Sequence, residues 1–148
     1  MPETSEPESL DRLFAQICRL KHARVHTLYE ALGLYRGQSR MLGALWAQEG
    51  LTHTELSRLL RVQPATITKM IQRMERAGFI ERRHDPADRR VSRVYLTAAG
   101  RAVREDVQRV WRRLEEEAFA GFTEEERALL GQFFARIRDN LSEAAGGE

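Results

Sequence analysis

A change of hydrophobic period within residues 52–97 constrains the fold more than any other feature of this sequence. Apolar residues first recur every three to four positions through two short segments, which are separated at Arg61-Val62-Gln63. Pro64 then suits the first position of a helix, because proline lacks the amide hydrogen that would be unpaired there. After Gly78 the pattern becomes strand-like in FIERR and VSRVYL, with HDPADRR supplying a turn between them. This order predicts two helices joined by a tight break and followed by a β-hairpin.

Local signals predict where the two helices begin and end. Thr52-His53-Thr54-Glu55 has the form of a capping box, in which the threonine oxygen accepts an amide hydrogen and the glutamate reaches back. The first helix is expected to bury Leu56, Leu59 and Leu60. The second is expected to end at Gly78, since glycine commonly follows the last helical turn. Its buried stripe is predicted to be Ile67, Met70, Ile71 and Met74.

Amphipathic segments flank this region on both sides. Residues 9–32 form one long helical pattern that ends at Gly33, and a shorter pattern ends at Gly50. Thr97 can cap a long helix after the hairpin, and Thr123-Glu124-Glu125-Glu126 repeats the capping-box form before a last helix. Their apolar stripes are Leu10, Leu13, Phe14, Ile17, Leu20, Val25, Leu28 and Leu32; Met41, Leu42, Leu45 and Trp46; Val103, Val107, Val110, Trp111 and Leu114; and Leu129, Leu130, Phe133, Phe134, Ile137 and Leu141.

These elements predict a mainly α fold of six helices with a small β-hairpin wing, which is a winged helix-turn-helix with an added helical region. We expect a disordered lead-in at residues 1–8, where acids and prolines prevail. The winged helix-turn-helix is expected at residues 35–97. Residues 9–34 and 98–145 are expected to supply the helical region.

Charge is distributed unevenly along the chain. Residues 52–97 contain ten basic and five acidic side chains, whereas residues 113–148 contain four basic and nine acidic ones. A basic middle and an acidic end indicate a region that faces a polyanion, carried by a region that faces something else.

Several classes of protein are disfavoured by the same sequence. No apolar run has the roughly 18–20 residues needed to cross a bilayer, and the acidic start lacks the pattern of a signal peptide. A single cysteine, Cys18, excludes an intramolecular disulfide framework. We therefore expect a cytoplasmic protein with no membrane partner. An enzyme is disfavoured because no glycine-rich phosphate loop or G-x-S-x-G nucleophile turn is present, and no cofactor or metal is expected.

The second helix of the pair has the side chains of a DNA-reading helix. In a helix-turn-helix this helix enters the major groove and makes base contacts near its N-terminus. Its first residues, Pro64 and Ala65, offer the free N-terminal end of a helix to a phosphate. The remaining outward or flanking positions suit phosphates, adenine and guanine; they are Thr66, Thr68, Lys69, Gln72 and Arg73. The alternative is that these residues form the solvated face of an ordinary helix.

The hairpin favours the DNA interpretation. Five arginines lie within twelve residues, Arg82, Arg83, Arg89, Arg90 and Arg93. Arginines at a hairpin tip can enter a narrow minor groove, where the potential is most negative. Asp88 is a poor neighbour for a phosphate unless it holds an arginine, and a bidentate pair of that kind would fix the guanidinium direction before DNA arrives. A hairpin that merely aids solubility does not explain so many arginines.

The residues 88–97 read DRRVSRVYLT, which has the pattern D-x-R-x-x-x-x-x-L-T and follows a helix ending in MERAGFIERR. This resembles the MarR family of bacterial and archaeal transcription regulators, over nearly the whole chain from Leu10 to Leu141. The resemblance implies a homodimer in which the first helix and last two helices of each subunit intertwine, so residues 9–34 and 98–145 become the dimerisation region. A dimer also suits a palindromic operator in double-stranded DNA, read in successive major grooves.

The resemblance assigns roles within the wing and suggests how binding is regulated. By position, Arg90 is the arginine expected in the minor groove and Asp88 is its orienting partner. The charge of the hairpin makes Arg83, Arg89 and Arg93 further candidates for DNA binding. Members are usually repressors released by a small aromatic molecule, a metal or an oxidant. A pocket for such an effector would lie between the dimer helices and the winged helix. Its candidate lining residues, each of which also suits a core or surface position, are His22, Tyr29, Arg40, Trp46 and Trp111.

Two other interpretations stay open. Cys18, His22 and His26 fall on one stripe of the first helix and are suitable zinc ligands, but the two ends lie about 12 Å apart along the axis. A redox- or metal-responsive regulator using these residues is one alternative, although the sequence QICRLKHAR around Cys18 departs from the peroxide-sensing branch of the family, which favours a buried structural thiol. A winged-helix module that binds proteins and not DNA is the other.

Overall fold

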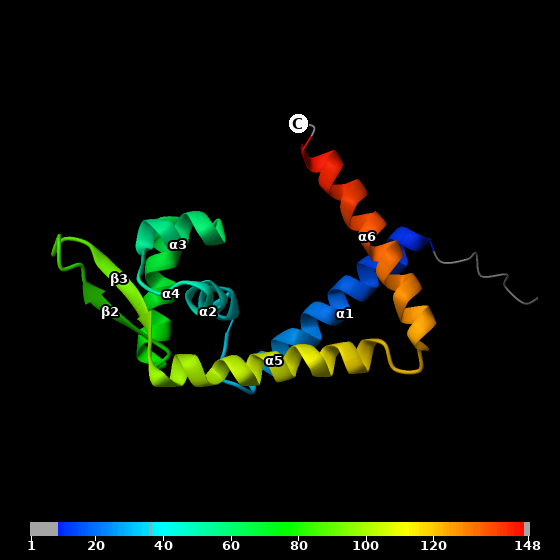
Figure 1. Cartoon of the computed structure of the whole chain (residues 1–148), viewed down its shortest axis with the longest axis horizontal. Coiled ribbons are helices and arrows are strands. Elements are labelled where there is room, and N and C mark those ends of the chain that lie inside the picture. The colour runs from blue at the N-terminus through cyan, green and yellow to red at the C-terminus, as the bar shows by residue number, and fades with distance from the viewer. Residues whose placement is uncertain (1–8, 36, 147–148) are drawn as a thin grey trace, which may run out of the picture. The chain divides into compact units, whose positions relative to one another are not determined.

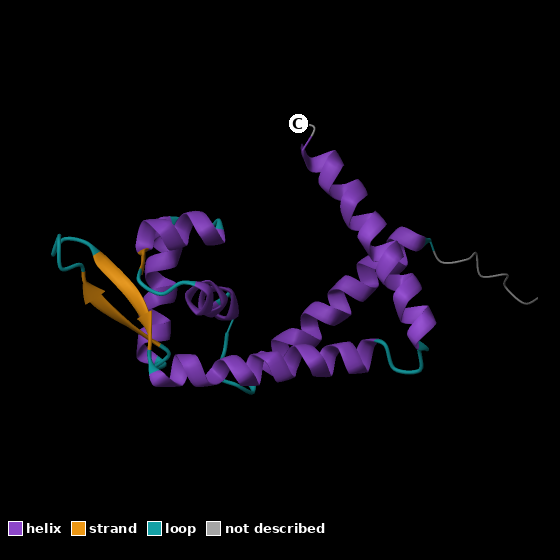
Figure 2. Ribbon diagram, viewed as in Figure 1, coloured by secondary structure: helices purple, strands orange, loops and turns teal. Residues whose placement is uncertain are grey.

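The computed structural model describes residues 9–35 and 37–146, so the expected lead-in at residues 1–8 lies outside the described residues. The elements follow the predicted order, with one additional short strand (Figure 1). They are α1 (Leu10–Glu30), α2 (Gln38–Ala47), β1 (Leu51–Thr52), α3 (His53–Leu60), α4 (Pro64–Arg76), β2 (Ile80–His84), β3 (Ser92–Leu96), α5 (Ala98–Ala118) and α6 (Glu124–Gly146). The mainly α fold with a small hairpin wing is therefore confirmed (Figure 2).

Contacts divide the chain into two units, Met1–Leu114 and Glu115–Glu148. The core of the first unit gathers residues from all of its described helices and strands. Leu34, Met41, Leu42, Leu56, Ile67, Ile71, Met74 and Val94 have no exposed surface in this core. Burying side chains of this size stabilises the fold by about 1.5–3 kcal/mol each.

The helix-turn-helix is formed by α3 and α4, and its local signals are those that the sequence predicts. Thr52 accepts a hydrogen bond from the Glu55 amide, and the Glu55 carboxylate accepts one from the Thr52 amide, which completes the capping box. Arg61 ends α3 in the left-handed conformation, with φ of 53°, and Pro64 begins α4. Leu59 is 59% exposed, so its predicted burial is wrong. The residues of α3 that reach the core are Leu56 and Leu60, which lie one helical turn apart.

The end of α4 leads directly into the sheet. Gly78 adopts φ of +84°, and the Phe79 and Gly78 amides donate to the carbonyls of Met74 and Glu75, as in a Schellman motif. The strand order is β1-β3-β2, all antiparallel, and Arg82 lies opposite Val94 in the hairpin register. The pairing of β1 with β3 is not predicted by the sequence, because two residues are too few to show a strand period.

The first turn of α5 locks the base of the hairpin to α2. The Thr97 hydroxyl accepts the Gly100 amide at 3.1 Å, as expected of its capping role. The indole N–H of Trp46 donates to the Gly100 carbonyl at 2.9 Å. Further along α5, Val103, Val107, Val110 and Leu114 are buried as predicted, whereas Trp111 is 47% exposed and contacts Tyr29 edge to face.

The second unit contains the end of α5 and the helix α6. Thr123 and Glu126 form the second predicted capping box at its start. Phe119 contacts the rings of Phe122 and Phe134, and the Arg127 guanidinium lies over it.

Two helices of the described chain present large apolar side chains to solvent. Only Tyr29 is buried on α1, and no residue of α6 is buried. The predicted apolar stripes of these two helices are 39–86% exposed in the single chain, at Leu10, Leu13, Phe14, Ile17 and Leu20 on α1, and at Leu129, Phe133, Phe134, Ile137 and Leu141 on α6. None of the helices in the described ranges is both long and apolar enough to cross a membrane.

Candidate nucleic-acid interface

The outer face of α4 carries the polar residues that the sequence singles out. Ile67, Ile71 and Met74 have no exposed surface, which fixes the rotation of the helix about its axis. The opposite side is exposed at Pro64, Ala65, Thr66, Lys69, Gln72 and Arg73, while Thr68 and Met70 are half-buried. The sequence therefore predicts the outward face of this helix correctly in the single chain.

The N-terminus of α4 is open. Its N-cap, Gln63, makes no side-chain capping bond, and Pro64 occupies the first turn without an amide hydrogen. The Thr68 hydroxyl donates to the Pro64 carbonyl at 3.1 Å, so it is turned back along the helix. A helix end of this kind has partial positive charge and amides available to an anion.

The tip of the hairpin carries two arginines without partners. Arg89 and Arg90 are exposed in the turn between β2 and β3, and within the described residues neither guanidinium has a hydrogen-bond or ion-pair partner. Asp88 accepts the backbone amide of Arg90 at 3.0 Å through its Oδ1 atom. The expected bidentate pair between the two side chains is not formed, because this short turn brings the carboxylate to the backbone amide two residues on.

The other three arginines of the hairpin are held within the protein. Arg82 makes a double hydrogen bond with Glu75 of α4, at 3.1 and 3.0 Å. Arg83 binds Glu81 and lies over the Tyr95 ring, with its Cζ atom 4.5 Å from the centroid. Arg93 donates to Asp85 at 2.6 Å. Sequence reasoning missed these pairs, since nothing in the order of residues says which acid each arginine meets.

The ion pairs shift the titration of their members. The hydrogen bond from Arg82 lowers the pKa of Glu75, and the hydrogen bond from Arg93 lowers the pKa of Asp85. Each arginine has a correspondingly raised pKa, chiefly because of the same hydrogen bond. All four groups therefore stay charged across the physiological range, and the pairs persist.

His53 lies close to the Glu75–Arg82 pair, at the start of α3. Its Nε2 atom is buried and has no hydrogen-bond partner among the described residues. Burial lowers the pKa of this imidazole, the charge of Arg82 lowers it further, and Glu75 acts in the opposite direction. The sequence shows no sign of this burial, because position 53 lies in a polar first turn.

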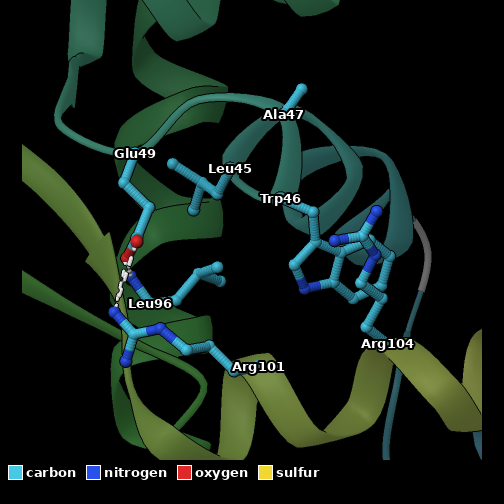
Figure 3. Close-up of a pocket in the computed structure, with 7 residues that line it drawn as sticks. All are labelled: Leu45, Trp46, Ala47, Glu49, Leu96, Arg101 and Arg104. Atoms are coloured by element: carbon cyan, nitrogen blue, oxygen red, sulfur yellow. Dashed lines mark hydrogen bonds and ion pairs between the residues drawn. The ribbon is translucent and has the colours of Figure 1, made fainter.

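The two hollows of the described chain that border candidate effector residues contain one such residue each. Trp46 borders a hollow of about 380 Å³ with Leu45, Ala47, Glu49, Leu96, Arg101 and Arg104, in which Arg101 reaches Glu49 (Figure 3). Arg40 borders a second hollow of about 290 Å³ beside α4 and donates to the Leu60 carbonyl. His22 is exposed on α1, and Tyr29 is buried against Trp111, where burial raises the pKa of its phenol.

The residues of the redox or metal alternative are spread along α1. Cys18 is a free, exposed thiol, so the expectation of a buried one is wrong for the single chain; it sits on a helix that buries only Tyr29. His22 is exposed, and His26 lies 3.3 Å from Glu30. Within residues 9–35 and 37–146, no group of three or more His, Cys, Asp or Glu side chains is arranged to hold a metal ion.

The geometry is that of a winged helix-turn-helix, and comparisons with known proteins agree. The model of the MarR family matches residues 34–92. The HTH-type transcriptional regulator TtmR of Methylorubrum extorquens is 30% identical over 148 residues, which cover 95% of this chain and 73% of that protein. The apo structure of wild-type MarR from E. coli is 25% identical, with a TM-score of 0.74 over 90% of this chain and 98% of that chain.

A mutant of S. aureus MepR bound to an oligodeoxyribonucleotide shares the fold, with 23% identity and a TM-score of 0.72 over 91% of this chain and 99% of that chain. The chain belongs to the MarR family and is a transcriptional regulator. The predicted family is thus confirmed, and this family consists of regulators and not of enzymes.

Proposed function

We propose that this protein binds a palindromic operator in double-stranded DNA as a homodimer, and represses transcription until a small-molecule effector releases it. The proposal rests on which basic side chains are paired with acids and which are not. Those on the outer face of α4 and at the tip of the hairpin are exposed and unpaired among the described residues, whereas the arginines between them are held by acids.

The face of α4 suits the major groove. An α-helix fits this groove, and side chains near its N-terminus reach base edges. Thr66, Lys69, Gln72 and Arg73 are exposed there, so they are free to bind bases or phosphates. Pro64, Ala65 and Thr68 lie in the first turn or two, where the open helix end suits a phosphate.

The tip of the hairpin suits the minor groove. Arg89 and Arg90 extend from a turn whose backbone Asp88 holds through the Arg90 amide. A narrow minor groove attracts arginine because of its negative potential. Asp88 thus orients the backbone that carries Arg90 and does not form the side-chain ion pair that the sequence suggests.

The apolar stripes of α1 and α6 favour a second copy of this chain. Each of the two helices carries five exposed large apolar side chains, and a row of such side chains commonly marks a surface that binds another protein. Both stripes lie outside the winged helix-turn-helix. Residues 9–34 and 98–145 are thus the proposed dimerisation region, and two copies would present two α4 helices to the two halves of a palindrome.

The comparison with MepR supports DNA as the partner, since the structure of that protein is of a mutant bound to an oligodeoxyribonucleotide. Repression follows where the operator overlaps a promoter, because a bound dimer excludes the polymerase. The effector is proposed by likeness to the family. Each hollow of the single chain contains only one of the five candidate residues among its lining. We therefore propose that the effector site is shared between two copies of the chain.

The DNA proposal is tested by selecting bound fragments from random genomic DNA and measuring their affinity by fluorescence anisotropy. Arg73→Ala and Arg90→Ala are each expected to weaken binding, by about 1–3 kcal/mol where the side chain contacts a base. Arg109→Ala on α5 removes an arginine that Asp106 already holds. It is the matched control once sedimentation equilibrium shows that its dimer is unchanged, and it should then bind like the wild type. Unchanged affinity in Arg73→Ala and Arg90→Ala would contradict the proposal and favour a protein-binding module.

The dimer is tested separately by sedimentation equilibrium at micromolar concentration. Ile137→Glu places a charge in the α6 stripe and is expected to give monomers, since an unpaired charge is costly in an interface. Ala128→Glu is the matched control, because a separation of nine residues puts it about 180° around the helix. A wild-type monomer, or an equal effect of both variants, would refute this interface.

A further inference from the structure

Arg93 links three separate places in the winged helix. It is the second residue of β3, the central strand of the sheet, and it pairs with Thr52 of β1 and Arg83 of β2. Its Nε atom donates to Asp85 Oδ2 at 2.6 Å, and its Nη1 atom donates to the Gly50 carbonyl at 2.8 Å. The Asp85 side chain is 15% exposed and that of Arg93 is 34% exposed, so this pair is more enclosed than the other ion pairs of the hairpin.

Asp85 closes the loop that forms the tip of the wing. It is the first residue after β2, and its amide donates to the Val91 carbonyl at 2.9 Å across the loop. Its Oδ1 atom accepts the Ala87 amide at 2.7 Å, while its other oxygen binds Arg93. The carboxylate therefore joins the backbone of the loop to the side chain of the central strand.

Gly50 anchors the other side of Arg93 just before β1. Its amide donates to the Val94 carbonyl at 2.9 Å, and its φ of +77° is one that glycine readily adopts. A Cβ atom here would lie 3.2 Å from the Tyr95 hydroxyl, so the backbone approaches the ring closely. Arg83, which is paired with Arg93 across the strands, places its guanidinium over the Tyr95 ring.

We propose that Arg93 is a positioning residue for the wing and does not itself contact DNA. Through Asp85 and the Gly50 carbonyl it holds the loop that carries Arg89 and Arg90 at a set angle to the helix-turn-helix. Its Nε and Nη1 atoms each donate a hydrogen bond within the protein, whereas the guanidinium groups of Arg89 and Arg90 have no partner among the described residues. The inference rests on the proposed DNA binding and divides the arginines of the hairpin between contact and support.

The substitution Asp85→Asn separates the two roles of Arg93 by the sign of its effect. If Arg93 contacts DNA, removing an acid from the wing frees the arginine and lessens repulsion, so affinity for the selected operator rises. If Arg93 positions the tip, the weaker amide partner loosens the loop and affinity falls, by about three- to thirtyfold for an effect transmitted through one coupled contact. Asp106→Asn on α5 also removes the acid partner of an arginine. It is the matched control once sedimentation equilibrium shows that its dimer is unchanged, and it should then leave affinity unchanged.

A second variant, Arg93→Lys, keeps the charge and loses the fork of two donors. One ammonium is not matched to two acceptors in different directions, so the positioning role predicts a loss of affinity similar to that of Asp85→Asn. A lysine that contacts a phosphate would bind about as well as the arginine. This variant keeps the test decisive should Asp85→Asn fail to fold, and thermal unfolding of each variant identifies a general loss of stability.

The Arg90→Ala background provides the readout that a merely structural role would not change. If Arg93 acts through the tip, Arg93→Lys weakens binding in the wild type and has little further effect once Arg90 is absent. Additive losses would overturn the proposal, as would tighter binding by Asp85→Asn. Failure of the proposed function gives a different result. In that case Arg90→Ala by itself leaves the affinity unchanged.

Discussion

Gly100 is the position where the structure predicts the largest effect from the smallest substitution. This residue lies in the first turn of α5 and is buried. A Cβ atom built on it would lie 2.1 Å from the Phe79 carbonyl oxygen and 3.1 Å from Leu96 Cδ2. The Phe79 carbonyl is itself held by the Thr97 amide at 3.1 Å, so the obstacle is a fixed backbone atom and not a flexible side chain.

The expected cost of Gly100→Ala follows from this geometry. Carbon–oxygen contacts in proteins ordinarily lie at about 3.3 Å or more, so α5 and the start of β2 must separate by roughly 1 Å. Overpacking of this kind costs about 1–3 kcal/mol and sometimes more, and a backbone obstacle places the substitution at the upper end. The shift also disturbs the Gly100 carbonyl, which accepts the Trp46 indole at 2.9 Å.

Gly43→Ala is the matched control, since it is the same substitution in the helix α2. Nothing lies within 4 Å of a Cβ at Gly43, so the alanine only restricts the unfolded chain and favours the helix. It should stabilise the protein by about 0.4–1 kcal/mol. The two variants are thus expected to differ by about 3 kcal/mol with opposite signs relative to the wild type.

The measurement is urea unfolding followed by far-UV circular dichroism, at one fixed protein concentration because the stability of a dimer depends on concentration. In thermal unfolding, Gly100→Ala should lower Tm by about 6–12 °C. Equal midpoints for the two variants would refute the reasoning, because they would show that α5 does not pack on the base of the hairpin as described.

Three further predictions follow from single residues. Thr52→Ala removes the capping box of α3 and should cost about 1 kcal/mol, whereas Thr54→Ala, an exposed threonine in the same turn, should cost less; urea unfolding compares them. His53 has a lowered pKa in the folded state, so its neutral form is favoured there, and the stability it contributes is complete above the unfolded value of about 6.5 and is lost as the pH falls below it. His53→Gln should make the free energy of unfolding depend less on pH between 7.5 and 5.5. An unchanged slope of that free energy against pH would count against the burial of His53. Arg61 adopts a left-handed conformation, which costs roughly 1 kcal/mol for a residue with a Cβ and which glycine adopts freely. The urea midpoint of Arg61→Gly should therefore not fall, whereas a glycine introduced inside a helix lowers the midpoint.

The parts of the fold that depend on neighbouring residues are those that the sequence predicts well. Both capping boxes form between residues three apart, and Pro64 begins α4 as expected. The stripe of α4 is a periodic pattern, so the outward face that bears Lys69 and Arg73 follows from it. Such signals need no knowledge of what the helix packs against.

The parts that the sequence misses depend on pairs far apart in the chain. The strand β1 exists only because Leu51 and Thr52 meet Val94 and Arg93, more than forty positions away. The same holds for Arg93 and the Gly50 carbonyl. A local pattern also made Asp88 and Arg90 look like an ion pair, although the turn brings the carboxylate to the backbone amide. Five arginines in a hairpin thus look alike in sequence and differ only once their partners are placed.

The salt dependence of operator binding tests the central claim most directly. Each phosphate contact releases counterions, so the logarithm of the affinity should fall steeply with the logarithm of the salt concentration, with a slope of about −0.9 per contact. The account predicts such a slope for the wild type and a slope smaller by about 1–2 for Arg89→Ala/Arg90→Ala, whose guanidinium groups are free of partners in the described chain. A wild-type affinity that does not change with salt, or an unchanged slope in the double variant, would contradict it.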